Sequence, residues 1–221
     1  MANFHSEDKN ILCSVSITAA RYSNGVYEGD LVNGERIGRG KLIFYNGNVY
    51  DGQWAKDQKS GRGCFTWCNG SVYEGSWFKD QKHGRGKITW SLKSYYEGDF
   101  VQDERTGLGK YKFSNGCIYE GRFNKDRRNG LGTLTYPDGR FFEGYWIDNK
   151  KHGRGKMTST VGRVVEGYWF DDKQAVRSEK TYGDGLYEGN LHNGERNGQG
   201  KFTWADGDVY EGDWIDDKKT G

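Results

Sequence analysis

A three-residue motif recurs along this chain at a nearly constant spacing. Tyr27-Glu28-Gly29 returns 23 residues later as Tyr50-Asp51-Gly52, and the step is 22 residues only once, from Val165 to Tyr187. The remaining copies begin at Tyr73, Tyr96, Tyr119, Phe142, Val165, Tyr187 and Tyr210. A fixed period of this length indicates structural units that contact mainly their neighbours. The sequence therefore predicts a repeat protein.

Within each unit, counted from the motif's first residue as position 0, apolar and polar residues alternate. Positions 0, +2 and +4 carry a ring, a glycine and a large apolar side chain, as in Tyr50, Gly52 and Trp54. A Gly-x-Gly at +11 and +13 precedes apolar residues at +15 and +17. Alternation with period two is typical of a strand with one solvated face, so each unit holds two strands. Glycines at +2 and +13 would let neighbouring rings lie flat over the backbone.

Two segments of each unit carry turn signals. A charged stretch with a basic residue at +9 predicts a charged turn between the two strands. The second strand ends in Asn-Gly or Asp-Gly, as at Asn46-Gly47, which favours a type I′ turn. Each unit is thus predicted to be a β-hairpin joined to the next by a tight turn, with any helix confined to the termini.

Tyr-Glu-Gly-x-Trp, the charged turn, Gly-x-Gly and Asn/Asp-Gly together resemble the MORN repeat (membrane occupation and recognition nexus). The resemblance implies an all-β fold, an elongated single-layer twisted antiparallel sheet of stacked 23-residue hairpins. It divides the chain into a lead-in or capping strand over 1–22 and a MORN-repeat domain over 23–221, with eight full repeats and a partial ninth. Because the chain stops inside a repeat, we expect it to be part of a longer protein.

The seventh repeat departs from this pattern. Val165 replaces the tyrosine, Gln174 replaces the basic residue, and no Gly-x-Gly occurs over 175–180. In the half-repeat before it, Ser159 replaces an aromatic residue. Two interpretations stay open at this stage: drift in a non-essential unit, or a bend or docking point.

Composition excludes several classes of protein. The 33 Lys and Arg nearly balance the 31 Asp and Glu, which argues against a dedicated nucleic-acid binder. The four cysteines, Cys13, Cys64, Cys68 and Cys117, occupy different repeat positions and are expected to be free thiols. The N-terminus is charged and no apolar run reaches the ~18 residues of a membrane span. We expect a soluble, cytoplasmic protein.

No motif in the chain predicts catalysis. The repeated Gly-x-Gly lacks the third glycine and the helix of a dinucleotide site. His83 and His152 share position +10 three repeats apart, which is not the spacing of a metal site. Carboxylates at +1 form a solvated stripe without a pocket that would raise a pKa. The sequence predicts no enzyme, no cofactor and no metal site.

Binding of a partner is the leading functional hypothesis. A one-layer sheet leaves one ring-lined face without a second layer, and such a groove suits a helix or an extended segment of a partner protein. A homodimer is a variant of this hypothesis. The residues predicted to contact the partner are Trp54, Trp67, Tyr73, Trp77, Trp90, Tyr96, Phe100, Phe113, Phe123 and Tyr136.

Two alternatives belong to other classes. One is a membrane-surface module that contacts acidic phospholipids, weakly because neighbouring aspartates such as Asp57 and Asp80 neutralise the basic row. Its predicted lipid-binding residues are Arg36, Lys59, Lys82, Arg105, Arg128 and Lys151. The other is a regulatory repeat region of a longer enzyme, a lipid kinase or a SET-domain lysine methyltransferase. The resemblance alone implies a cytoskeletal, ciliary or membrane-associated setting.

Overall fold

The computed structural model describes residues 16–90 and 93–220, and within them it contains strands and turns but no helix. The antiparallel strands form open sheets of stacked hairpins, which confirms the predicted all-β class. No helix that could cross a membrane occurs in these residues. Cys13 and the part of the predicted capping strand before Ser16 lie outside them. The chain divides into two units, Met1–Ser91 and Leu92–Gly221, which we describe separately.

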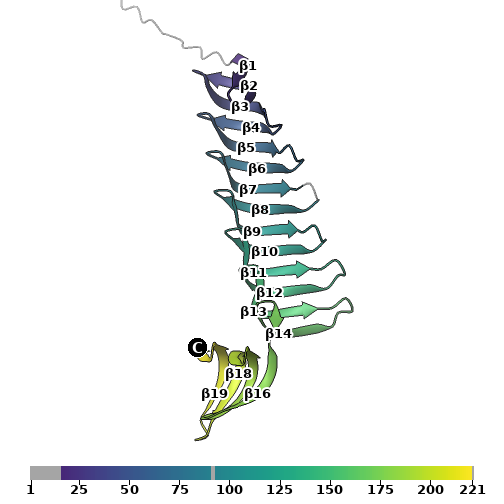
Figure 1. Cartoon of the computed structure of the whole chain (residues 1–221), viewed down its shortest axis with the longest axis vertical. Coiled ribbons are helices and arrows are strands. Elements are labelled where there is room, and N and C mark those ends of the chain that lie inside the picture. The colour runs from purple at the N-terminus through teal and green to yellow at the C-terminus, as the bar shows by residue number, and fades with distance from the viewer. Residues whose placement is uncertain (1–15, 91–92, 221) are drawn as a thin grey trace, which may run out of the picture. The chain divides into compact units, whose positions relative to one another are not determined.

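The first unit is a run of antiparallel strands in which each strand pairs with the next in the chain (Figure 1). Strand β1 lies in the lead-in and pairs with β2 from Ser16↔Leu31 to Tyr22↔Gly25. The strands are β1 (Ser16–Tyr22), β2 (Gly25–Val32), β3 (Glu35–Phe44), β4 (Val49–Ala55), β5 (Gln58–Thr66), β6 (Val72–Phe78) and β7 (Gln81–Thr89).

The second unit contains two runs of strands. The first run is β8 (Tyr95–Val101), β9 (Glu104–Lys112), β10 (Ile118–Asn124), β11 (Arg127–Thr135), β12 (Phe141–Ile147), β13 (Lys150–Thr158), β14 (Val164–Phe170) and β15 (Lys173–Gln174). The second run is a separate five-stranded sheet of β16 (Val176–Tyr182), β17 (Gly185–His192), β18 (Glu195–Trp204), β19 (Val209–Ile215) and β20 (Lys218–Thr220).

The type I′ turns lie at +6 and +7, and not at the Asn-Gly and Asp-Gly dipeptides that follow the second strand, where the sequence suggested them. Lys56 and Asp57 have φ angles of 49° and 63°, and Lys79 and Asp80 have 49° and 67°. A type I′ turn requires positive φ at both of its central residues. At Asn46-Gly47 only the glycine has positive φ, and Gly47 N donates to the Phe44 carbonyl over 3.0 Å. That loop is a longer turn, in which Asn46 Oδ1 accepts from Asn48 N.

Each glycine of Gly-x-Gly has its own role. In the hairpin of β4 and β5, Gly52 pairs with Gly63 but Gln53 pairs with Ser60, so the intervening residues form a bulge. Gly61 sits in this bulge with φ of 58°, a conformation that favours glycine. The second glycine makes room for a ring, since a Cβ at Gly63 would lie 2.4 Å from the Tyr50 hydroxyl. The prediction that rings lie over these glycines is therefore confirmed.

The core of the first unit is a layer of rings in edge-to-face contact. Tyr50, fully buried, lies with its ring centroid 5.0 Å from Trp54 of its own repeat and 5.4 Å from Trp77 of the next. Both pairs are T-shaped, the geometry that the ring quadrupoles favour. The Tyr50 hydroxyl donates to the Gln53 carbonyl at 2.9 Å, so its polar end is satisfied. Rings thus join each hairpin to the next without a second layer of secondary structure.

The seventh repeat breaks the sheet, which supports the bend over simple drift. After the two residues of β15, Ala175 N donates to the Tyr168 carbonyl over 2.7 Å, and the chain leaves β14. The next strand, β16, pairs with β17 in the five-stranded sheet. Val165, which replaces a buried ring, is 39% exposed. The missing ring and the missing Gly-x-Gly therefore coincide with the point where one sheet ends and another begins.

The five-stranded sheet begins in the same way as the first sheet of the chain. Strand β16 pairs with β17 from Val176↔Leu191 to Tyr182↔Gly185, as β1 pairs with β2. Both starts also carry the turn sequence Asn-Gly-Glu-Arg and a leucine at +4, where most later repeats carry a ring. The leading hairpin of each sheet thus has a sequence of its own.

Candidate functional site: the ring face

We call the side of each sheet that carries positions 0, +4, +9, +15 and +17 the ring face, and the opposite side the outer face. Rings at 0 and +4 are buried on the ring face. Tyr73 and Tyr96 are 0% exposed, and every +4 ring among the predicted partner contacts is 6% exposed or less. These predicted partner residues are Trp54, Tyr73, Trp77, Tyr96, Phe100 and Phe123. They pack the core of the unpartnered chain, and their contact with a partner stays a prediction.

The rings at +17 are more accessible. Trp67 is half-buried and tilts against Phe65 with ring centroids 4.7 Å apart, and Phe113 packs in the same way on Tyr111 at 4.3 Å. Trp90 and Tyr136 are also half-buried. Phe44 and Trp204 occupy the same position, so the repeat pattern places them in this row although they were not among the predicted site residues. We call these residues the +17 row: Phe44, Trp67, Trp90, Phe113, Tyr136 and Trp204.

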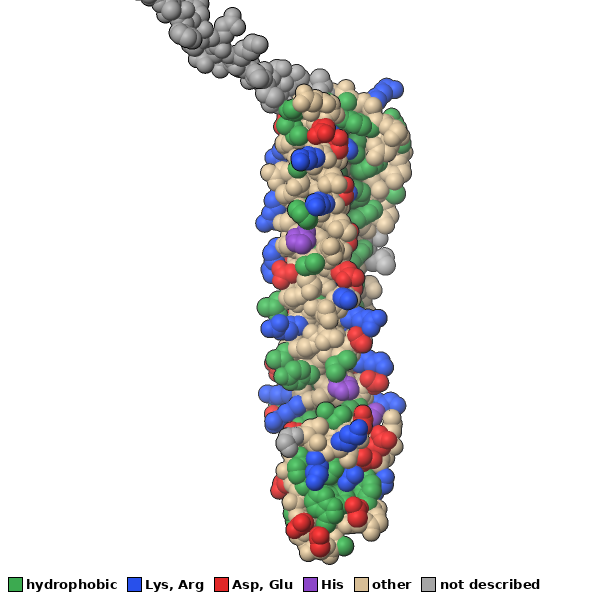
Figure 2. Space-filling view, turned by 90° about the vertical axis from the view of Figure 1, so that its left-hand side faces the viewer, with side chains coloured by type: hydrophobic (Ala, Val, Ile, Leu, Met, Phe, Trp, Pro, Cys, Tyr) green, Lys and Arg blue, Asp and Glu red, His purple; other side chains and the backbone are tan. Residues whose placement is uncertain are grey.

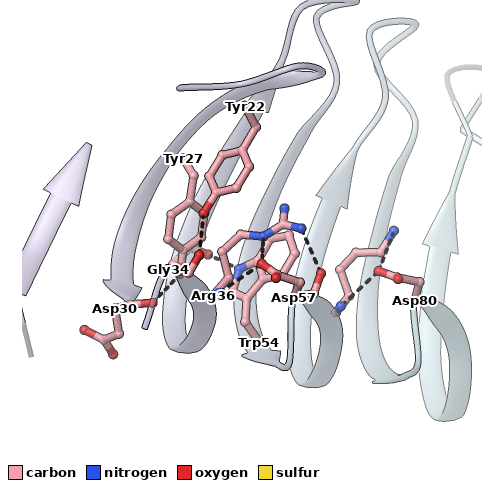
Figure 3. A network of polar contacts seen from close by, with 10 residues as sticks. Tyr22, Tyr27, Asp30, Gly34, Arg36, Trp54, Asp57 and Asp80 are labelled. Carbon is pink, nitrogen blue, oxygen red and sulfur yellow. Dashed lines mark hydrogen bonds and ion pairs between the residues drawn. The ribbon is translucent and has the colours of Figure 1, made fainter. Parts of the chain in front are cut away.

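The basic residues at +9 lie on the ring face and not in a turn. Because the turn occupies +6 and +7, position +9 pairs across the hairpin with +4, as Trp54 does with Lys59. The Arg36 guanidinium lies 4.3 Å from the Trp54 ring centroid and 4.9 Å from that of Tyr22 (Figure 3). Arg128 stacks in the same way on Trp146 at 4.4 Å and on Phe113 of the +17 row at 5.6 Å. Cations therefore cover the buried rings and border the +17 row.

Each of these cations is tied to the turn of the following repeat. Arg36 donates from its backbone N and its Nε to Asp57 Oδ1, over 3.0 Å and 2.9 Å, while Asp57 N donates back to the Arg36 carbonyl (Figure 3). The backbone N–H of Arg36 and then its guanidinium lower the pKa of Asp57. Arg105 with Asp126 and Arg196 with Asp217 repeat the arrangement. The aspartate thus neutralises the cation and bonds two repeats together.

Buried tyrosines of the ring face are kept neutral. Burial raises the pKa of Tyr27 to about 12, with a smaller contribution from Asp30. Burial likewise raises the pKa of Tyr119 and of Tyr187 to about 12. Each hydroxyl donates to the carbonyl three residues on, as Tyr119 does to Arg122 over 3.0 Å. These groups are structural donors and offer no base or nucleophile.

The residues predicted for the lipid alternative are all only partly accessible. The side chains of Arg36, Lys59 and Arg105 are 13%, 16% and 21% exposed and are paired with aspartates. Lys82, Arg128 and Lys151 are also half-buried on the ring face. A phospholipid head group at Arg36, Lys59 or Arg105 would have to replace an aspartate. On the face seen in Figure 2, basic and acidic side chains are interspersed.

Nothing in the described residues forms a metal centre. No group of three or more His, Cys, Asp or Glu side chains lies close enough there to hold an ion. His83 packs against Phe78 at 5.7 Å, and His152 against Phe170 at 5.3 Å. Both histidines therefore act as aromatic packing partners in this structure.

Comparison with known families identifies the repeat. The family described as "MORN repeat" matches eight segments of the chain: 27–49, 50–72, 73–91, 96–118, 119–139, 142–162, 187–209 and 210–221. The longest gap in this series, from 163 to 186, contains the seventh repeat and the sheet break. A comparison with curated proteins finds no match.

Several solved structures show a distant likeness. The TCP domain of Drosophila melanogaster SAS-4 (dCPAP), solved with a proline-rich motif of Ana2 (dSTIL), is 10% identical over 66% of this chain and 79% of its own, with a TM-score of 0.41. The G-box domain of the microcephaly protein CPAP is 13% identical over 88% and 96% of the two chains, with a TM-score of 0.32. At these scores neither likeness supports a functional argument.

Proposed function

This chain belongs to the MORN-repeat family, and we propose that it is a non-catalytic interaction scaffold that binds a helix or an extended segment of a partner protein on its ring face. The +17 row is the observation that carries the proposal. Half-buried rings recur there in six of the repeats, next to core rings that are already buried. Aromatic side chains with a partly free face are the residues most often found at the centre of protein interfaces.

The chemistry of the surface favours a protein segment over a lipid head group. The +9 cations lie over rings, and Arg36, Lys59 and Arg105 are also paired with aspartates, so much of the surface offers apolar contact area with its positive charge neutralised. An apolar or amphipathic segment would bury this area, whereas an anion would gain little. In each unit the rings are spaced by one hairpin, so a partner that follows the row would meet them as a regular series.

The experiment selects ligands and then tests the surface. A displayed library of random peptides, selected on the purified chain, supplies segments whose affinity is measured by fluorescence anisotropy. We expect Trp67→Leu and Phe113→Leu, one in each unit, to weaken binding by roughly tenfold or more, the loss typical of a ring at an interface centre. The thermal midpoint should change little, because these rings are already partly solvated.

Matched controls lie on the outer face. Phe78 is 53% exposed and Tyr145 is 51% exposed, and they occupy the same two units. Phe78→Leu and Tyr145→Leu should leave binding unchanged. Binding that is lost in these controls but kept in Trp67→Leu and Phe113→Leu would place the partner on the outer face and refute the proposal.

Vesicle binding and a charge-reversal variant test the lipid alternative. Vesicles that contain phosphatidylserine or phosphoinositides should not sediment the chain tightly at physiological ionic strength. Tight sedimentation that Lys59→Glu abolishes would instead favour the membrane module. For the cellular setting we propose a cytoplasmic protein of a cytoskeletal, ciliary or membrane-associated assembly. A tagged chain spread uniformly through the cytosol would argue against that setting.

A further inference from the structure

A pocket of about 450 Å³ lies in the second unit, where the sheet of β8–β15 ends and the five-stranded sheet begins. Its walls come from β13 and β14 on one side and from β17, β18, β19 and β20 on the other. Of its lining residues only Trp214 occupies a ring-face position, and none belongs to the +17 row, so the pocket is separate from the surface proposed above. No family property assigns it a role, because it lies at the irregular repeat.

Specific contacts hold the two walls together. The Tyr168 hydroxyl donates to Asp213 Oδ1 over 2.6 Å, across 45 residues of chain. The ring of Tyr168 lies directly against Gly198, where a Cβ would come within 2.7 Å of it. Phe170 stacks on His192 with centroids 4.9 Å apart and an angle of 25° between the rings. Phe170 is 7% exposed, so the pocket has a packed aromatic floor.

The lining is acidic as well as aromatic. Asp171, Asp213 and Asp216 line the pocket, and no Lys or Arg does. Asp171 is paired with Lys150 outside the lining, at 3.2 Å. Asp213 Oδ1 accepts from Tyr168 and from Gln199 Nε2, which leaves its second oxygen for another donor. Carboxylates over aromatic faces are the arrangement that proteins use to bind organic cations.

A buried donor without a partner also points to a ligand. Asn197 lines the pocket and is 1% exposed. Its Oδ1 accepts from the backbone N of Asp216 over 3.0 Å. This bond distinguishes the oxygen of the side-chain amide from its nitrogen. Its Nδ2 is buried and makes no hydrogen bond. A buried unpaired donor costs free energy, so the site gains from a ligand that brings an acceptor.

We propose that this pocket binds an arginine side chain of a partner polypeptide. The planar guanidinium would stack on the aromatic wall and donate to Asp216 and to the free oxygen of Asp213. A carbonyl of the same polypeptide would accept from Asn197 Nδ2. Arginine suits the site better than lysine because its flat, forked head both stacks on rings and donates to two carboxylates.

The probe is N-acetyl-arginine-N-methylamide, added to the intact chain and followed by NMR. We expect saturable shifts confined to the imidazole signals of His152 and His192 and to the Trp214 indole. The citrulline analogue has the same shape without the charge and should bind about tenfold more weakly, the difference expected for charge-assisted hydrogen bonds.

Two aspartate variants complete the test. Asp216 and Asp148 both occupy position +6 of a turn, with φ of 46° and 47°, but only Asp216 lines the pocket. Asp216→Asn should weaken binding of the arginine probe about tenfold, as the citrulline substitution does, and Asp148→Asn should leave it unchanged. The proposal is wrong if the probe causes no saturable shifts. It is equally wrong if citrulline binds as well as arginine or if Asp148→Asn has the same effect as Asp216→Asn. The effect of Trp67→Leu on peptide binding does not change these outcomes. The ring-face proposal and the pocket proposal can therefore be refuted independently.

Discussion

The indole Nε1 of Trp54 donates a hydrogen bond of 3.0 Å to the carbonyl oxygen of Gly40 in the preceding repeat. Trp77, Trp146 and Trp214 make the same bond to Gly63, Gly132 and Gly200, at 3.2, 3.1 and 3.2 Å. The +4 tryptophan therefore reaches backward, from its own hairpin to the one before. Leu31 and Leu191 occupy +4 in the leading hairpins of the two sheets, where no preceding +13 glycine is paired. The bond explains why those two positions do not need a tryptophan.

We expect Trp54→Phe to lower the free energy of unfolding by about 1 kcal/mol, because it removes this bond and keeps most of the ring. Trp54→Ala should cost about 3–5 kcal/mol, because it also leaves a cavity among buried rings. Urea unfolding followed by circular dichroism measures both. Phe100→Leu is the control, because Phe100 occupies +4 and has no indole to donate. It should lower the free energy of unfolding by less than about 1.5 kcal/mol. Equal losses in Trp54→Phe and Trp54→Ala would show that the bond and not the packing dominates.

Gly63→Ala should destabilise the chain by about 1–3 kcal/mol, because its methyl group would overlap the buried ring of Tyr50. Gly183 provides the matched control. A Cβ there meets no atom within 4 Å, and its φ is not in the positive range. Gly183→Ala should therefore be neutral or slightly stabilising, by up to about 1 kcal/mol. Similar thermal midpoints for the two variants would contradict the role assigned to the +13 glycine.

Acid should weaken the contact between Arg36 and Asp57. The pKa of Asp57 is lower in the folded chain than in the unfolded chain, so its contribution to stability is present above about pH 3.9 and is lost as the pH falls through the lowered value. Asp57→Asn should keep the backbone bond to Arg36 but remove that share of the acid dependence. The readout is the thermal midpoint at neutral and at acidic pH.

The reverse substitution tests the same contact. Asn149 occupies the aspartate's position opposite Arg128 and accepts from its backbone N at 3.0 Å. Asn149→Asp should therefore raise the thermal midpoint at neutral pH and lose this gain on acidification. An increase that persists at acidic pH would mean that the charge is not the cause.

Backbone amides around the sheet break should exchange hydrogen faster than those within the regular hairpins. Strand β15 has two residues and pairs only at Trp169↔Gln174 and Phe170↔Lys173. Residues 171–176 therefore have few ladder hydrogen bonds, whereas β13 pairs on both sides. Hydrogen exchange measured by mass spectrometry compares the two segments, with β10–β11 as the internal standard. Equal protection at 171–176 and in β13 would rule out a weak link at the seventh repeat.

Much of the fold could be predicted from the repeat. Its period identified the hairpins, and the alternation of rings and glycines identified the buried face, because side chains two residues apart lie on one side of a strand. The turn type could not be predicted correctly in this way. Asn-Gly is the strongest local signal for a type I′ turn, yet Lys56 and Asp57 form such a turn. In that conformation Asp57 bonds to Arg36 in the preceding repeat, which local turn signals do not show.

The candidate site was predicted in part. The sequence gathered the rings at +4 and +17 into one surface, and both do lie on the ring face. It did not separate them, because exposure depends on the neighbouring hairpin: Lys59 of the preceding repeat covers Trp77 at 4.7 Å, whereas Trp67 is half-buried. The sequence assigned position +9 to a charged turn. Its placement over the rings follows from the turn at +6 and +7.

The sequence by itself determined the unit, its strands, its buried rings and the place where the pattern fails, because each of these depends on residues close together in one repeat. Only the tertiary structure decided what happens at that failure. Val165, Gln174 and the missing glycines mark a lost hairpin, but they do not say that β16 starts a new sheet. Nor do they say that Tyr168 reaches Asp213, 45 residues away. That contact joins residues from two sheets, so no pattern within one repeat predicts it.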